Sequence, residues 1–328
     1  MAPSILATGA MSDTLQETDF ANLIVLLILR ALWRFSRPHT IIGTSLSVWA
    51  VYGLAWLLAA PQESSAVWLG VGAWGACLLG NVYIVGLNQL WDVDIDRVNK
   101  PHLPLANGDF SLQQGRWIVG ICGAGALMFA AGLGMWLGLT VGISLLIGTA
   151  YSVPPLRLKR FSLLAALCIL AVRGMVVNLG LFLFFSQAFN QQAQLSPRIW
   201  VLTLFILVFS VAIAIFKDVP DMEGDRQFKI QTLTLQVGKE NVFVGTCILL
   251  SLCYLGIIAW SLLTTVPLNV PVFVGSHLCL LAVLWWRSQR VNLEDKAAIT
   301  SFYQFIWKLF FLEYLLYPLV SWLPNTSV

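Results

Sequence analysis

Residues 88–100 read NQLWDVDIDRVNK and close a long apolar segment with three acidic side chains. Asn88, Asp92 and Asp96 are spaced four residues apart, so they share one face of a continuous helix, whereas Asp94 lies on the opposite side. Carboxylates at the mouth of a membrane helix are costly unless cations neutralise them. Oxygen ligands of this kind suit Mg²⁺, which proteins usually bind through one or two carboxylates plus substrate phosphates. The stretch therefore predicts a Mg²⁺ site at the end of a membrane span.

A second acidic segment, KDVPDMEGDRQF at residues 217–228, also follows an apolar run. Its three Asp residues stand at i, i+3 and i+7, which places them on one helix face. Acids at a helix end often only cap or solvate the helix, so one such segment alone would leave the metal interpretation open. Two segments favour one shared site, whose candidate metal ligands are Asp92, Asp96, Asp218, Asp221 and Asp225. The first four are also the candidate catalytic residues.

The composition indicates a polytopic membrane protein. The chain is 58% hydrophobic and 11% charged, with 14 Trp and a mean hydropathy of +0.80, which is unlike a soluble domain. The net charge of +3 is too small to suggest nucleic-acid binding. All six Cys lie in apolar runs without a CxxC pair, so we interpret them as reduced packing residues. The three scattered His make a zinc site improbable.

The apolar runs predict an all-α protein with about nine transmembrane helices. Residues 117–153 and 241–286 carry no Asp, Glu, Lys or Arg, and each run exceeds the ~20 residues that cross a bilayer. Each must therefore turn back, the first at residues 132–138 and the second around Pro267. The expected spans lie near residues 39–59, 67–91, 116–134, 136–151, 162–186, 199–217, 242–264, 268–286 and 302–322.

Two short segments precede this transmembrane domain, which we expect to occupy residues 37–328. Residues 1–19 form a polar, mildly acidic tail without the features of a signal or transit peptide. Residues 20–36 carry Arg30 and Arg34 in an apolar stretch with Trp33. This pattern is typical of an amphipathic helix lying at the membrane interface.

Basic residues set the expected orientation. With the amino terminus inside, sixteen of the 19 Lys and Arg fall in inner segments. Arg198 falls in an outer loop, and Arg173 and Lys308 fall within spans. The positive-inside rule then opens both acidic segments to the cytoplasm.

Carboxylates that share a cavity repel one another strongly, and Mg²⁺ with a diphosphate would relieve this repulsion. Basic and polar groups would complete the anion site, and the candidate diphosphate-binding residues are Asn88, Arg97, Lys100, Tyr151, Arg157 and Lys159. Such a site serves metal-assisted loss of diphosphate from an allylic carbon, in a cavity that shields the carbocation from water. Two simpler roles remain open. Asn88 could bond a neighbouring helix, and the basic residues 157–160 could determine topology.

Arg173 lies about eleven residues into the fifth expected span, where an unpaired guanidinium costs at least ~2.5–3.5 kcal/mol. Pairing with Glu313 of the last span, or with helix carbonyls, is the simpler interpretation. The functional interpretation is that Arg173 binds the carboxylate of an acceptor substrate.

At these residues the chain resembles the UbiA superfamily of intramembrane aromatic prenyltransferases. NQLWDVDIDRVNKP is similar to the NxxxDxxxD motif of that superfamily, and KDVPDMEGDRQFKIQTL is similar to its second aspartate motif. Together with YSVPPLRLKRF, these stretches look most like the homogentisate prenyltransferase branch. Members acting on other acceptors usually have Asn-Asp where this chain has Asn88 and Gln89.

The resemblance implies a nine-helix α barrel in which Mg²⁺ holds a prenyl diphosphate between the two motifs. It also implies the reaction, which is decarboxylation of homogentisate with transfer of phytyl from phytyl diphosphate, giving 2-methyl-6-phytyl-1,4-benzoquinol for tocopherol (vitamin E) synthesis. We expect a bacterial protein, most consistent with a cyanobacterial inner or thylakoid membrane. The lipid bilayer is an expected partner, and no obligate protein partner is evident.

Other interpretations of the function remain open. Within the same family, the prenyl group could be solanesyl or geranylgeranyl. From another class, a membrane transporter or a divalent-cation channel would also carry acids in spans. Transporters place ionisable residues near the bilayer midplane, whereas these acids lie at helix mouths, which disfavours transport.

Overall fold

The computed structural model describes residues 22–59, 66–220, 222 and 233–323. Every regular element in these ranges is helical. Within them, nine helical stretches are long and apolar enough to cross a membrane, which confirms the predicted number of spans. The spanning elements are α2 (Pro38–Ala59), α3 (Ala66–Trp91), α6 (Leu112–Leu133), α7 (Met135–Ser152), α8 (Ser162–Ile169) continued by η2 (Leu170–Val176) and α9 (Val177–Asn190), α10 (Pro197–Phe216), α13 (Lys239–Leu263), α14 (Val270–Ser288) and α15 (Lys296–Trp322).

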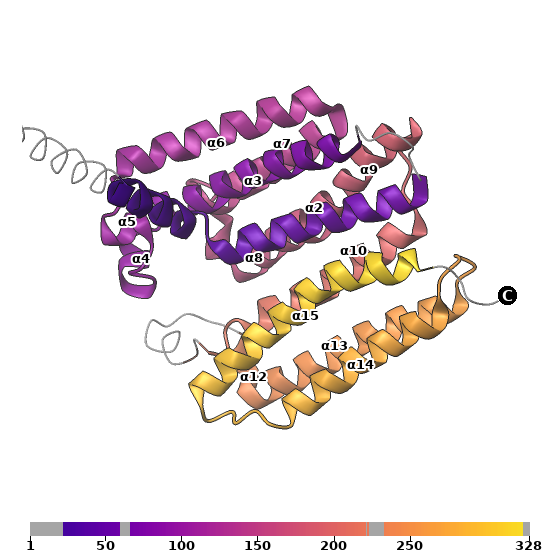
Figure 1. The fold of residues 1–328 in the computed structure, drawn as a ribbon. Coiled ribbons are helices and arrows are strands. Elements are labelled where there is room, and N and C mark those ends of the chain that lie inside the picture. The colour runs from indigo at the N-terminus through magenta and orange to yellow at the C-terminus, as the bar shows by residue number, and fades with distance from the viewer. Residues whose placement is uncertain (1–21, 60–65, 221, 223–232, 324–328) are drawn as a thin grey trace, which may run out of the picture.

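The spanning helices form a closed ring. Each packs against the next along the chain, from α2 on α3 round to α14 on α15, and α15 returns to pack on α2. Figure 1 shows them as elongated helices running side by side, with both halves of the chain contributing. The short helices α4 (Val93–Asn99), α5 (Pro104–Asn107) and α12 (Leu233–Val237) lie at one end of this ring, opposite the carboxyl terminus (Figure 1).

The long uncharged runs turn where the sequence predicts. Gly134 alone separates α6 from α7, with φ of 158°, a backbone conformation that favours glycine. Ser111 starts α6 with a capping box, in which its hydroxyl and the side chain of Gln114 each accept a backbone N–H. The second run turns between α13 and α14, where the Asn269 side chain caps α14 by accepting from the Val272 N–H.

Residues 22–35 form a helix whose carboxyl end packs against the ring. Most of its apolar side chains are exposed. The side chains from Leu23 to Leu29 are all exposed, whereas Phe35 is buried against Phe110. The Gln89 amide donates to the Phe35 carbonyl at 2.7 Å, and Arg34 pairs with Asp109 at 2.5 Å. These contacts fix the start of α2 beside the end of α3.

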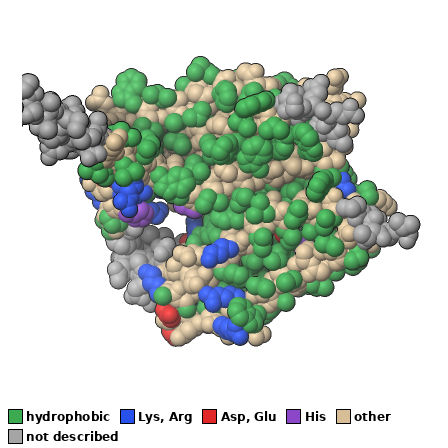
Figure 2. All heavy atoms as spheres, in the orientation of Figure 1, with side chains coloured by type: hydrophobic (Ala, Val, Ile, Leu, Met, Phe, Trp, Pro, Cys, Tyr) green, Lys and Arg blue, Asp and Glu red, His purple; other side chains and the backbone are tan. Residues whose placement is uncertain are grey.

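The surface supports a membrane-embedded protein. In Figure 2 hydrophobic side chains cover most of the face shown, and Lys and Arg gather mainly at its left and lower edges. An opening lies at the left end between the two halves, with Lys, Arg and His side chains at its rim (Figure 2). This is the end at which α4, α5 and α12 lie.

A buried polar pair joins the last two spans. His277 on α14 and Glu313 on α15 are both fully buried, and His277 Nε2 lies 3.2 Å from Glu313 Oε1. The other ring nitrogen, Nδ1, donates to the Phe273 carbonyl at 2.6 Å, so one further proton must lie on Nε2 or on the carboxyl group. The expected pairing of Arg173 with Glu313 is wrong, because Glu313 Oε1 bonds His277 and the Arg173 guanidinium lies over the rings of Trp307 and Phe310 instead.

We expect His277→Leu to lower stability by about 1–3 kcal/mol, since it leaves the Glu313 carboxyl group buried without its partner. Glu313→Gln should cost less, because its amide N–H can donate to Nε2 of the neutral His277 ring, whose proton lies on Nδ1. Thermal unfolding of the purified protein in detergent measures both effects. His102→Leu is the control, because His102 is exposed and uses only its backbone carbonyl to contact Arg34. Equal melting temperatures for His277→Leu and His102→Leu would contradict a stabilising role for the pair.

Candidate functional site

The sequence spacing suggested that the first acidic segment is one continuous helix, but the structure breaks it into two. α3 ends at Trp91 and α4 begins at Val93, with Asp92 between them at φ −117° and ψ 14°. The Asp92 carbonyl accepts from the Asp96 N–H and so starts a new helix. Its carboxylate makes no capping bond and is therefore free to bind groups from elsewhere.

Two cations from the loop after α7 hold this carboxylate. Arg157 Nη2 donates to Asp92 Oδ1 at 3.0 Å, and Lys159 Nζ donates to Asp92 Oδ2. The side chains of Asp92 and Lys159 are each only 13% exposed. Burial lowers the pKa of the Lys159 ammonium, and the hydrogen bond with Asp92 opposes that shift. The structure thus brings together three residues that the sequence placed in one site.

Asp96 is more deeply buried than Asp92. It is 5% exposed, and its Oδ2 atom has no hydrogen-bond partner. Burial raises the pKa of its carboxyl group, while the charges of Arg37 and Lys100 lower it. A buried carboxylate oxygen without a donor is costly, and it suits a hard cation such as Mg²⁺. The donor set of Asp92 and Asp96 therefore fits a Mg²⁺ ion.

Asp94 and Arg97 point away from this cluster. Their side chains are 93% and 60% exposed, and they pair with each other at 2.9 Å on the surface of α4. We expected Arg97 beside the carboxylates, and the structure does not place it there, because Arg97 pairs with Asp94 on the exposed face of their helix. Lys100, by contrast, lies close enough to Asp96 to lower the pKa of that carboxyl group.

Arg37 is a candidate site residue that the sequence reasoning missed. Its Nη2 donates to Asn88 Oδ1 at 3.2 Å. Burial lowers the pKa of its guanidinium, and the neighbouring Asp96 and Asp92 raise it. Arg37 and Arg157 adopt positive φ, which among the described non-glycine residues only Gln191 shares, and such conformations cluster at functional sites. The available signal was an Arg just before Pro38, where the first expected span begins.

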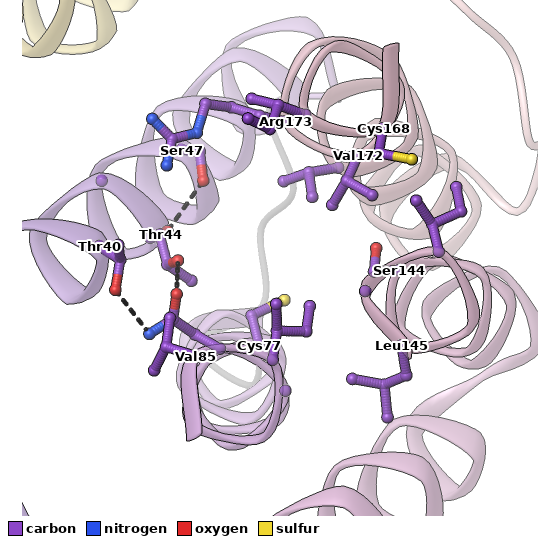
Figure 3. A pocket seen from close by; sticks show the side chains of 18 of the residues that line it. Thr40, Thr44, Ser47, Cys77, Val85, Ser144, Leu145, Cys168, Val172 and Arg173 are labelled. Atoms are coloured by element: carbon purple, nitrogen blue, oxygen red, sulfur yellow. Dashed lines mark hydrogen bonds between the residues drawn. The ribbon is translucent and has the colours of Figure 1, made fainter. Parts of the chain in front are cut away.

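A cavity of about 280 Å³ opens below this cluster. Arg37, Asn88, Tyr151 and Ser152 line one part of it, and the Asn88 amide donates to Ser152 at 3.5 Å. The remaining walls come from five spans and are mainly apolar, with polar side chains interspersed. Figure 3 shows hydroxyl groups projecting from α2, where the pocket residues Thr40 and Thr44 both bond to Asn81 of α3.

Arg173 lines the same cavity from η2, at a distance in sequence from the acidic cluster. In Figure 3 its side chain extends across the cavity toward the helix that carries Ser47. Its guanidinium carbon lies 4.9 Å from the ring centre of Trp307 and 5.9 Å from that of Phe310. The part of the chain that the structure describes offers it aromatic faces and no carboxylate.

The second acidic segment is only partly described. Asp218 is half-buried in the turn that follows α10, whereas Asp221 and Asp225 lie outside the described residues. Among the residues that the structure does describe, no three His, Cys, Asp or Glu side chains come together as a metal cluster. The expected joint site of the two segments thus stays a prediction.

Known proteins resemble the chain along most of its length. It is 72% identical to homogentisate phytyltransferase of Synechocystis sp. (strain ATCC 27184 / PCC 6803 / Kazusa), covering 91% of this chain and 98% of that protein. It is 41% identical to homogentisate phytyltransferase 1, chloroplastic, of Arabidopsis thaliana, covering 89% and 76% respectively. The solved structure of a UbiA homologue from Archaeoglobus fulgidus bound to GPP and Mg²⁺ has the same fold, with a TM-score of 0.61, 17% identity and coverage of 88% and 100%.

The family assignment rests on the sequence match and agrees with the fold. The model of the UbiA prenyltransferase family matches residues 47–309, a range that includes Asp92, Asp96 and Arg173. The ring of spans agrees with the all-α barrel expected from the resemblance, and the protein is a multi-pass membrane enzyme. The chain belongs to the UbiA prenyltransferase family.

Proposed function

We propose that this chain transfers phytyl from phytyl diphosphate to homogentisate, with loss of the acceptor's carboxylate as CO₂, to give 2-methyl-6-phytyl-1,4-benzoquinol in tocopherol synthesis. The observation that supports it most directly is the 72% identity to the Synechocystis relative, which is named for this activity. Geranylgeranyl or solanesyl transfer to the same acceptor is the alternative, since donors of different chain length carry the same diphosphate.

The carboxylates serve in this proposal as the Mg²⁺ site. Asp92 and Asp96 of the first segment act together with Asp218, Asp221 and Asp225 of the second. The buried, unpartnered Oδ2 of Asp96 supports this role, as does the Mg²⁺ bound to the Archaeoglobus homologue. When bound, Mg²⁺ stabilises the negative charge that develops on the diphosphate leaving group.

The cations at the mouth bind the diphosphate. Arg157 and Lys159 now neutralise Asp92, so they already stand beside the proposed metal ligands. Once Asp92 is neutralised by another cation, both can donate to diphosphate oxygens with little movement. Arg37 and Lys100 add positive charge, and Asn88 and Tyr151 add polar contacts at the cavity entrance.

The cavity contributes by excluding water. Loss of diphosphate leaves an allylic cation that water would capture, and walls made mainly of apolar side chains prevent this. The aromatic rings of Tyr151, Phe310 and Tyr314 line the cavity, and their faces can stabilise positive charge. The acceptor ring then has to bind within reach of the same space.

Placement in the cell follows the charge pattern. We place the acidic mouth on the cytoplasmic side of a cyanobacterial inner or thylakoid membrane, by the positive-inside rule. The exposed apolar side chains of residues 22–35 suit a helix lying in the membrane interface. The domain division is then a polar tail at 1–19, this interfacial helix and a transmembrane domain at 37–328.

The experiment that tests this function measures product formation. Membranes containing the protein are incubated with radiolabelled homogentisate, Mg²⁺ and diphosphates of prenyl chains of increasing length. We expect the phytyl donor to give the highest kcat/KM and the product to have lost the carboxylate. A preference for a longer or unsaturated donor would favour the alternative, and no product with any donor would favour the transporter reading.

Asp92→Asn and Asp218→Asn should each reduce turnover at saturating Mg²⁺ to below about a tenth of the wild-type rate, because a neutral amide oxygen binds Mg²⁺ more weakly than a carboxylate and balances none of its charge. Asp94→Asn is the matched control, since Asp94 belongs to the same segment and points away from the cluster. Each purified variant is assayed at equal folded concentration. Asp92→Asn that turns over as fast as Asp94→Asn would exclude the metal role.

Arg157→Ala and Lys159→Ala should raise the KM for the prenyl diphosphate about tenfold or more and change the KM for homogentisate much less, since a lost charge-assisted contact is worth roughly 1.5–3 kcal/mol. Arg160→Ala is the matched control in the same loop, because Arg160 is exposed and donates to the Pro155 carbonyl. Steady-state kinetics with each substrate varied in turn separates the two KM values. Equal increases for both substrates would indicate a role in folding or topology.

A further inference from the structure

Arg173 is a cation in the membrane interior whose charge nothing in the described chain balances. Its guanidinium lies over the faces of Trp307 and Phe310. Glu313, the acid expected to pair with it, is bonded to His277, and Asp92 is held by Arg157 and Lys159. An unbalanced charge at this depth is costly and usually marks a functional site.

The backbone that carries Arg173 is a π-helix, and it is held rigidly. Residues Leu170–Val176 form this π-helical stretch within the fifth span, and such wide turns recur at functional sites. The Asn178 amide donates to the Gly174 carbonyl at 2.9 Å, and the Tyr314 hydroxyl donates to Asn178 Oδ1 at 3.1 Å. Gly174 packs so closely on α10 that a Cβ there would lie 2.3 Å from Leu207 Cδ2.

The direction of the side chain follows from this backbone. Helical side chains lean toward the amino end of their helix, and for this span that end lies beside the loop carrying Arg157 and Lys159. Arg173 lines the cavity, and Figure 3 shows its side chain extending toward the helix that carries Ser47. The packed backbone and the rings of Trp307 and Phe310 under the guanidinium hold the Arg173 side chain in position for a ligand.

The surroundings indicate what kind of ligand this is. Phe310 and Tyr314 offer aromatic faces to the cavity, and Thr44, Ser47 and Ser144 line it with hydroxyl groups. The proposed diphosphate site is made by other residues, among them Arg37 and Lys159. A small aromatic molecule carrying a carboxylate and ring hydroxyls matches the cation, the rings and the hydroxyl groups together.

We propose that Arg173 binds the carboxylate of the aromatic acceptor and orients its ring in the cavity. The inference rests on the proposed function, in which homogentisate brings this carboxylate and the product no longer has it. Arg173 then distinguishes substrate from product, because only the substrate offers an anion to the guanidinium. Asn178 and Tyr314 are positioning residues that act through the π-helix.

Binding of two ligands to the purified protein tests this. The first is homogentisate, and the second is methylhydroquinone, which keeps the ring and both hydroxyls and lacks the carboxylate. Arg173→Gln should weaken homogentisate binding at least about tenfold, since a buried charged contact loses its partner, and should change methylhydroquinone binding by less than about twofold. Arg173→Lys should fall between, because it keeps the charge and loses the planar fork.

Arg290→Gln is the matched control. Arg290 also stacks on a Trp, with its guanidinium carbon 3.9 Å from the ring centre of Trp286, but it is exposed and away from the cavity. It should leave the binding of both ligands unchanged. If Arg173→Gln is recovered unfolded, the ratio of the two affinities in Arg173→Lys decides instead.

The outcomes separate this inference from the proposed function. Equal loss of both ligands in the Arg173 variants, or loss of neither, overturns the role of Arg173 even if the wild-type protein makes the phytylated product. If the wild-type protein binds neither homogentisate nor methylhydroquinone and gives no product, the proposed function itself fails.

Discussion

This site depends on the ion pairs that the Asp92 carboxylate makes with Arg157 and Lys159 at the end of a membrane helix. It joins the end of α3 to the loop after α7, two elements that are far apart in sequence. Carboxylates and cations are each expensive to hold near hydrocarbon, and together they offset much of that cost. Charge balance at this mouth therefore determines both how the helix ends meet and which ligands the mouth can accept.

The same constraint organises the cavity below. Polar groups are tolerated inside a membrane protein only when they are bonded or line a cavity, and the row of hydroxyls from α2 meets Asn81 of α3 in this way. The two cavity arginines differ in their surroundings. Arg37 bonds Asn88 and interacts with the charges of the acids at the mouth. The Arg173 guanidinium instead lies over aromatic rings. This difference supports separate anion sites for a diphosphate and for a carboxylate.

Much of the fold was predictable, because bilayer thickness dictates helix length and uncharged runs have few ways to turn. Gly134 marks the turn that the sequence located, and the ends of the spans agree within six residues, the largest difference being the start of α15 at Lys296. Local spacing could not predict the break at Asp92, since ion pairs with a distant loop accompany it. It could not find the partner of Glu313 either, because the contact with His277 depends on how α14 and α15 pack. Arg97 was misplaced for a different reason, since its partner Asp94 is local and holds it on the exposed face of α4.

An experimental structure with Mg²⁺ and a non-reacting thiol analogue of phytyl diphosphate would test the central claim most directly. We expect Asp92 and Asp96 to contact Mg²⁺ and the prenyl chain to enter the cavity below Tyr151. We also expect Arg157 and Lys159 to turn from Asp92 to the diphosphate oxygens. A diphosphate bound elsewhere, with the contacts of Asp92 to Arg157 and Lys159 intact, would contradict it.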